Sequence, residues 1–255
     1  MKRTNPKPST GAGSADDWLT PGRFALLLAL LIFAMFSKVL LGDATFVFRD
    51  FGMFSYPVAH FHRECFWRGE LPLWNPFNNC GIPFLAQWNT LALYPGSLIY
   101  LLLPLNWSLS FFCLAHLFWG GLGMYFLARQ WTNQRLASGL AGVIFAFNGL
   151  SLNFLMWPSH VATFSWLPWT VWLGQRAWRE GGRMLVWGTL AGTMQMLAGG
   201  PETILLTWLI LLVLACGDWL KEKELRRRIV PRLAGMGVLV ALLCAIQLLP
   251  FLELL

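Results

Sequence analysis

The stretch FALLLALLIFAMFSKVLL, residues 24–41, decides the class of fold. It carries one charged residue, Lys38, which lies close enough to the end of the stretch for its ammonium group to reach a membrane surface. No cleavage site with small residues follows it. We therefore interpret residues 24–41 as a retained membrane anchor and not as a signal peptide.

The composition of the whole chain agrees with a protein that crosses a membrane several times. Of its 255 residues 56% are hydrophobic and only 12% are charged, and the mean hydropathy is +0.55. Such a chain is too apolar for a soluble globule of this size. The net charge is +7, but the basic residues stand in short clusters between apolar runs, as in membrane proteins. We expect membrane lipids as partners and no nucleic acid.

Further apolar segments predict an all-α transmembrane bundle of about seven spans. The predicted spans after the first are 109–127, 137–155, 161–177, 184–198, 203–216 and 234 to the end. Connections rich in Lys and Arg alternate along the chain, which fits this number only if the apolar segment 91–105 does not cross. The basic residues before the first span place the N-terminus in the cytoplasm and the following loop outside the cytoplasmic membrane.

The organisation predicted from the sequence has two parts. Residues 1–20 are rich in Pro, Ser, Gly and charge and are expected to form a disordered cytoplasmic tail. Residues 21–255 are expected to form one transmembrane module, in which 42–106 is a large outer loop. The chain ends inside an apolar run, so we expect a longer protein of which this is the front portion.

The loop 42–106 is predicted to carry two helices at the membrane surface. Phe54, Val58, Phe61 and Cys65 recur at helical spacing and predict a short helix lying on the membrane. The apolar segment 91–105 is interrupted by prolines and is too short to span, which predicts a second interfacial or re-entrant helix.

Cysteine placement leaves one question open. Cys113, Cys216 and Cys244 lie in apolar runs and are expected to do no chemistry. Cys65 and Cys80 both lie in the long loop, and their spacing does not decide whether they form a disulfide.

Several short motifs in a fixed order resemble those of the YfhO-type bacterial membrane proteins. The motifs are GELPLWNP (69–76), GIPFLA (81–86), LYP (93–95), HLFWGGLGMYFLAR (116–129), WLPW (166–169), AGGPET (198–203) and QLLP (247–250). That family is similar to the GT-C glycosyltransferases, integral enzymes that take a sugar from a polyprenyl-phosphate donor outside the cytoplasmic membrane. The resemblance covers nearly all residues after Phe24 and implies the same order of a first span, a large outer loop with two juxtamembrane helices, and further spans.

The resemblance implies an acidic catalytic residue early in the first outer loop. Asp50 occupies the matching position, and glycosyl transfer needs a base for the acceptor hydroxyl group. The alternative is a solvated aspartate or one paired with Arg49, because exposed acids are commonplace. Asp43 is a rival for the role, although it lies nearer the end of the first span.

Other residues of the outer face are candidates for binding substrate. Arg49, His60 and Arg63 have the charge to hold a lipid phosphate, or equally to anchor the loop to anionic headgroups. Trp74 and Asn75 have the chemistry to stack on and hydrogen-bond a sugar, although interfacial tryptophans are common without one. His160 and Glu202 lie in tight outer turns beside prolines, where ionisable residues often serve function, yet Glu202 suits the start of a helix equally well.

A metal site is not among these predictions. His60 and Glu64 share a helix face, but His62 points elsewhere. No cofactor is implied with certainty, and a divalent metal ion in the active site stays open. The sequence thus favours a membrane glycosyltransferase acting on a polyprenyl-phosphate-linked sugar and a cell-wall polymer, lipid or glycan acceptor. The alternatives are a lipid or glycolipid transporter or flippase, and a non-catalytic assembly protein.

Overall fold

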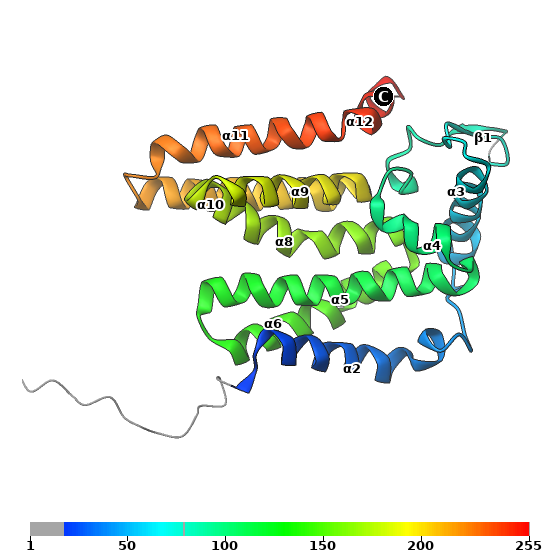
Figure 1. The fold of residues 1–255 in the computed structure, drawn as a ribbon, viewed down its shortest axis with the longest axis horizontal. Coiled ribbons are helices and arrows are strands. Elements are labelled where there is room, and N and C mark those ends of the chain that lie inside the picture. The colour runs from blue at the N-terminus through cyan, green and yellow to red at the C-terminus, as the bar shows by residue number, and fades with distance from the viewer. Residues whose placement is uncertain (1–17, 79, 255) are drawn as a thin grey trace, which may run out of the picture.

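The computed structural model describes residues 18–78 and 80–254, and most of them are helical (Figure 1). The long helices run side by side as a bundle: α2 (Pro21–Leu40), α5 (Leu105–Thr132), α6 (Arg135–Phe147), α8 (Pro158–Glu180), α9 (Arg183–Ala198), α10 (Pro201–Lys221) and α11 (Arg226–Leu243). Shorter helices extend two of them, namely α7 (Gly149–Asn153) with the 3-10 turn η4 (Phe154–Met156) after α6, and α12 (Ala245–Leu254) after α11.

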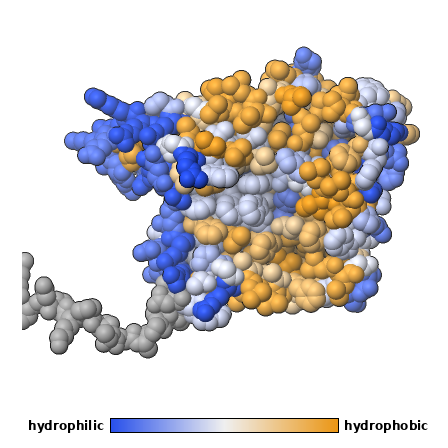
Figure 2. Space-filling model, viewed as in Figure 1, coloured by the Kyte–Doolittle hydropathy of each residue, from blue (hydrophilic) through white to orange (hydrophobic). Residues whose placement is uncertain are grey.

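Within the described residues, four helices are long and apolar enough to cross a membrane: Pro21–Leu40, Leu105–Thr132, Arg135–Met156 and Pro201–Lys221. A fifth span results if α11 and α12, which are bent by 78° against each other, count as one. Their surfaces carry many exposed leucine, isoleucine, valine and phenylalanine side chains, which a soluble protein would bury. Figure 2 shows these apolar side chains as a broad band between two hydrophilic ends. This is the pattern of a multi-pass membrane protein.

Each of the seven predicted spans coincides with a helix. Two of these helices, α8 and α9, do not meet the length and hydropathy expected of a membrane-spanning helix. Helix α9 has 16 residues, and α8 carries polar side chains such as Ser165, Thr170 and Gln175. These three side chains are buried, because α8 packs against α5, α9, α10 and α11 in the middle of the bundle. A helix surrounded by other helices has less need of an apolar surface than one that faces lipid.

Small residues bring α5 and α6 together. A Cβ atom on Gly121 would lie 3.1 Å from the carbonyl oxygen of Gly142, and one on Gly142 would lie 2.7 Å from that of Gly121. The two backbones therefore approach closely at this crossing.

The two ends of the bundle differ in charge. One end, which we call the basic end, contains the start of α2 and the connections α5–α6, α8–α9 and α10–α11, with Arg23, Arg129, Arg135, Arg176, Arg179, Arg183 and the basic residues of 221–232. Arg179 there binds Asp218 at 2.6 Å and Glu222 at 3.1 Å, which ties α8 to the end of α10. The opposite end, which we call the loop end, contains residues 41–104, the α7–α8 and α9–α10 turns and α12.

The predicted loop helices are found in part. A turn of π-helix, η1 (Phe51–Ser55), leads into α3 (Tyr56–Arg68), which lies across the loop end of the bundle (Figure 1). Segment 91–105 is not the single helix we predicted. It consists of the 3-10 turn η3 (Pro95–Ser97) and the short α4 (Leu98–Leu102), because Pro95 and Pro104 confine the helix between them.

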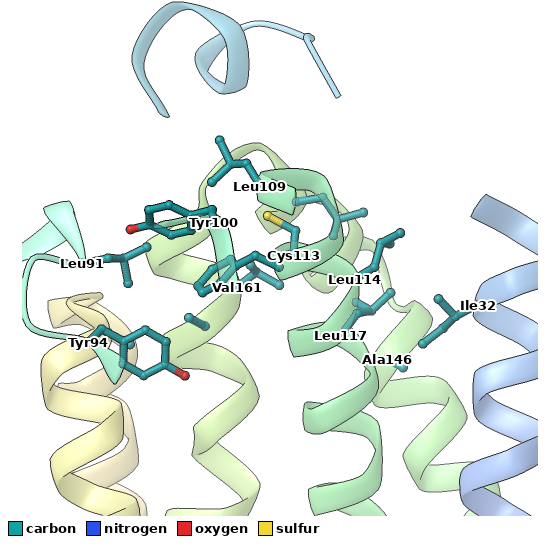
Figure 3. Packing of buried hydrophobic residues seen from close by; sticks show 14 of the residues in the cluster. Ile32, Leu91, Tyr94, Tyr100, Leu109, Cys113, Leu114, Leu117, Ala146 and Val161 are labelled. Atoms are coloured by element: carbon teal, nitrogen blue, oxygen red, sulfur yellow. The ribbon is translucent and has the colours of Figure 1, made fainter. Parts of the chain in front are cut away.

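Between these pieces lie a small hairpin and a tightly packed connection. Strands β1 (Trp74–Asn75) and β2 (Ile82–Pro83) pair antiparallel, and the 3-10 turn η2 (Trp88–Thr90) follows. Leu91, Tyr94 and Tyr100 then pack against Cys113 of α5 and Val161 of α8 (Figure 3). The loop is thus attached to the bundle core over much of its length.

Hydrogen bonds fix the position of Tyr94 in this connection. His116 Nδ1 donates to the carbonyl oxygen of Phe112 at 2.7 Å, so His116 Nε2 accepts from the Tyr94 hydroxyl at 2.7 Å. The same hydroxyl accepts from Trp166 Nε1 at 2.8 Å. His116 is therefore a hydrogen-bonded core histidine.

One smaller expectation is corrected and one open question is answered. The predicted tail reaches residue 20, but Leu19 is buried, Tyr125 donates to its carbonyl oxygen, and Thr20 caps α2. Residues 1–17 lie outside the described residues. The disulfide left open between Cys65 and Cys80 is not formed, since all five cysteines are free, with Cys65 buried and Cys80 exposed.

Candidate functional site

The polar residues singled out in the sequence gather at the loop end, and the largest group surrounds α3. Pro57 stands in the first turn of α3, where its missing N–H costs nothing, and Gly69 ends the helix in a left-handed conformation. Val58, Phe61 and Cys65 on one face pack against Phe84, Leu85 and Ala92. The opposite face of the helix is left for His60, Arg63 and Glu64.

A groove of about 660 Å³ lies between α3 and the β1–β2 hairpin, and we call it the α3 groove. His60 and Glu64 supply polar groups from the helix, and Asn75 and Asn78 supply them from the hairpin. Aromatic side chains of Phe54, Tyr56, Phe61 and Phe77 complete its walls. The structure thus brings together two of the predicted binding residues, His60 and Asn75.

A second groove, of about 550 Å³, lies on the other side of His60 and Glu64. We call it the arginine groove, and it is lined by His60, Arg63, Glu64, Trp67, Arg68 and Leu105. Arg63 lies over the Trp67 ring at 6.0 Å, and its buried Nε atom has no hydrogen-bond partner among the described residues. Arg68 is paired with Glu70 at 3.1 Å. The arginine groove is therefore suited to an anion.

His60 and Glu64 form the ridge between the two grooves. Their closest nitrogen and oxygen atoms are 3.9 Å apart, too far for a hydrogen bond, and both side chains are about half exposed. Polar atoms of both residues therefore remain available to a ligand.

His62 takes no part in either groove wall formed by His60. Its ring is buried against Phe84 and Tyr100, and its Nδ1 lies 3.3 Å from the Tyr100 hydroxyl. Burial lowers the pKa of His62 to about 4, which keeps the ring neutral at pH 7. Among the described residues, no group of three or more His, Cys, Asp and Glu side chains is arranged to hold a metal ion.

We predict that His62 makes the stability of the protein depend on pH. Its pKa is about 4 when folded but about 6.5 when unfolded, so the unfolded chain binds the proton more readily. The neutral His62 ring therefore leaves the free energy of unfolding at its full value above about pH 7. As the pH falls from 6.5 towards 4, this free energy decreases by up to about 3 kcal/mol. Thermal unfolding between pH 7.5 and about 4.5 measures it.

The variant His62→Gln, which cannot take up the proton, is expected to flatten this pH dependence. His60→Gln on the exposed face of the same helix serves as the control and is expected to retain it. A His62→Gln protein that loses stability with acid as steeply as the wild type would contradict the assignment.

Asp50 and Arg49 lie just before this group. Arg49 is exposed and has a positive φ of 48°, and Asp50 is half-buried at the start of η1. In the described part of the chain neither side chain has a hydrogen bond or ion pair, so the alternative of an Asp50–Arg49 pair is not realised. Asp50 is not among the residues that line the α3 groove or the arginine groove.

The turn with His160 adjoins η1 through aromatic contacts. Ser55 donates to the carbonyl oxygen of Met156 at 3.2 Å, and the Phe54 ring lies 6.1 Å from that of Trp157. The Trp157 ring in turn lies 5.6 Å from His160. The structure therefore places the start of the loop helix beside the α7–α8 turn, although no direct contact joins Asp50 to His160.

His160 and Glu202 are brought together from two turns that are far apart in the sequence. His160 Nε2 lies 4.0 Å from a Glu202 carboxylate oxygen, and His160 Nδ1 lies 3.2 Å from the Ser159 hydroxyl. Burial lowers the pKa of His160, and the Glu202 carboxylate opposes that shift. Glu202 also stands in the first turn of α10, where a negative charge is favourable. Stabilisation of the helix start therefore explains its position equally well.

The tryptophans of the loop have structural contacts. The Trp74 side chain is about half exposed and its ring covers Gly81, but Trp74 does not line the α3 groove. Trp88 Nε1 donates to the carbonyl oxygen of Met196 at 2.7 Å, which ties η2 to the end of α9. The sequence offered no means of telling these roles from sugar stacking.

The structure adds residues that the sequence did not select. Phe77 and Asn78 follow the LPLWNP motif and join the α3 groove because the hairpin folds back over α3. Glu64 was considered only for a metal, although its spacing from His60 predicted the shared face.

No protein-family model matches the chain, and comparisons with curated proteins and with solved structures found no match either.

Proposed function

We propose that the protein is a multi-pass membrane glycosyltransferase that transfers a sugar from a polyprenyl-phosphate donor to an extracytoplasmic acceptor. The observation that carries this proposal is the loop end itself. The loop end carries the Asp50 carboxylate, which has no ion-pair partner among the described residues. It also carries the arginine groove and the α3 groove, and it lies at the end of the bundle opposite the basic residues. The motif resemblance to YfhO-type proteins of the GT-C class supports the same function.

In the proposed reaction the acceptor hydroxyl oxygen attacks the anomeric carbon of the donor sugar. The bond from this carbon to the phosphate oxygen breaks, polyprenyl phosphate leaves, and the hydroxyl proton passes to the Asp50 carboxylate. Arg63 and His60 in the arginine groove stabilise the charge on the departing phosphate. Leu105, the first residue of α5, lies in the wall of that groove, which suits a phosphate whose prenyl chain is in the membrane.

The proposal includes the orientation of the chain in the membrane. Basic residues cluster at one end of the bundle, which by the positive-inside rule faces the cytoplasm, and the loop end then faces outwards. It also includes seven crossings, because α8 and α9 run alongside the more apolar helices. This places the protein in the cytoplasmic membrane with residues 42–106 outside.

The orientation can be measured with the native Cys80, which is exposed at the loop end. We predict that a membrane-impermeant maleimide labels Cys80 in intact cells. A cysteine placed at Lys223 in the α10–α11 connection, with Cys80→Ser, is expected to react only after the membrane is permeabilised. Labelling in the reverse order would contradict the proposed orientation and with it an extracytoplasmic reaction.

The function is tested with radiolabelled polyprenyl-phosphate hexoses and N-acetylhexosamines. Membranes from cells that express the chain are expected to move label from the lipid donor to an acceptor, and membranes without it are not.

The second candidate, a lipid or glycolipid transporter, is favoured by buried polar side chains in the bundle. Gln195 and Gln247 each have a buried side-chain oxygen with no hydrogen-bond partner among the described residues. A transporter would move the donor across the bilayer with its sugar–phosphate bond intact, which separates the two functions.

A further inference from the structure

The α3 groove and the arginine groove differ in charge although they share His60 and Glu64. The arginine groove has Arg63 and Arg68 in its walls, whereas no Lys or Arg is among the described residues that line the α3 groove. Glu64 lines both grooves, but only in the arginine groove do Arg63 and Arg68 offset the repulsion between its carboxylate and an anionic ligand. The α3 groove is therefore unsuited to an anion and needs a different ligand.

The walls of the α3 groove suit a carbohydrate. Aromatic rings offer flat apolar faces to the C–H groups of a sugar ring, and carboxylate and amide groups bond its hydroxyl groups. Tyr56 and Phe77 supply the first kind of group, and Glu64 and Asn78 supply the second. The volume of about 660 Å³ lies within the range of small-molecule sites, roughly 300–1,000 Å³.

The rim of the groove is unusually exposed for apolar residues. Phe77 is 83% exposed and Met53 is 84% exposed, and both line the groove, one from the hairpin and one from η1. The Phe77 ring lies 6.2 Å from the Phe61 ring in an edge-to-face arrangement. Because most of its surface is exposed, the Phe77 ring is available to a ligand.

The wall that carries Phe77 is held in place before any ligand binds. The Asn75 side-chain oxygen accepts from the Phe77 backbone N–H at 3.0 Å, and Phe84 donates to the carbonyl oxygen of Leu73 at 2.8 Å. Phe84 itself is fully buried against α3. A preformed site of this kind loses little entropy when the ligand binds.

We propose that the α3 groove binds an uncharged glycan, stacked on Phe77 and hydrogen-bonded to Glu64 and Asn78. The proposal rests on the proposed function only in the role that it gives to this glycan, which is that of the acceptor. The phosphate of the donor then belongs in the arginine groove, and the acceptor and the donor sugar meet at the His60–Glu64 ridge.

Binding is measured on the full chain in lipid nanodiscs with four uncharged trisaccharides: maltotriose, cellotriose, galactotriose and triacetylchitotriose. Saturation-transfer NMR and titration calorimetry measure the binding. At least one trisaccharide is expected to bind. Phe77→Ala is expected to weaken it about tenfold, and Glu64→Leu is expected to weaken it as well.

Phe48→Ala is the matched control, because Phe48 is a 68% exposed aromatic residue of the same loop that does not line the α3 groove. It is expected to leave the affinity unchanged, and thermal unfolding verifies that all three variants are folded. The proposal is overturned if none of the trisaccharides binds the wild type, or if Phe77→Ala binds as tightly as the wild type does.

Failure of this proposal is distinct from failure of the proposed function. Trisaccharide binding needs no donor, so it persists in a protein that transfers nothing. Sugar transfer with unaltered binding in Phe77→Ala would place the acceptor elsewhere on the loop end and leave the transferase function intact.

Discussion

Replacing Asp50 by asparagine is expected to lower the rate of sugar transfer by about 10²–10⁴-fold. The amide has nearly the shape of the carboxylate but cannot accept the proton of the acceptor hydroxyl group. Because Asp50 has no hydrogen bond or ion pair in the described structure, the substitution is expected to leave folding and thermal stability unchanged. The measurement is the initial rate of label transfer from polyprenyl-phosphate sugar at saturating donor.

Asp43→Asn is the matched control for this experiment. Asp43 is an exposed aspartate of the same loop, just after the first long helix, and its replacement is expected to change the rate less than about twofold. A transfer rate that survives Asp50→Asn would remove Asp50 from the mechanism. A rate that is lost in Asp43→Asn instead would transfer the role of base to Asp43.

Replacing Gly199 by alanine is expected to destabilise the protein by at least about 3 kcal/mol. Gly199 has a φ of +80°, and an added Cβ atom would overlap the carbonyl oxygen of Trp88 and lie 2.6 Å from the carbonyl carbon. These are backbone atoms, so no rotation of a side chain relieves the clash. Moving η2 away would break the bond from Trp88 Nε1 to Met196 and the contact of Gln247 Nε2 with Trp88 at 3.4 Å.

Thermal unfolding in detergent is expected to shift down by about 10 °C in Gly199→Ala. Gly217→Ala in α10 is the control, since nothing lies within 4 Å of its added Cβ atom, and it is expected to change stability by less than about 1 kcal/mol. Equal unfolding temperatures for the two variants would show that η2 is not locked against the α9–α10 turn.

The long apolar segments were predictable because a bilayer demands them. Each predicted span contains or overlaps a helix, and the spacing from Phe54 to Cys65 predicted α3, since these features depend on local periodicity alone. The prediction of a single helix over segment 91–105 was wrong. Its path is decided by the two prolines and by the packing of Tyr94 onto His116. Length and hydropathy give four or five spans in the described chain, fewer than the seven predicted. One reason is that α8 is buried by its neighbours and needs no apolar surface, which is a tertiary property.

The candidate site divides in the same way. The sequence by itself determined that a charged, aromatic loop follows the first apolar segment, and that His60 and Glu64 share a helix face, because both facts follow from charge and from the 3.6-residue period. Only the tertiary structure decided that the hairpin folds over α3 and that Glu202 meets His160. Those contacts join residues distant in the chain, and their energies depend on packing across the loop end, which no local pattern encodes.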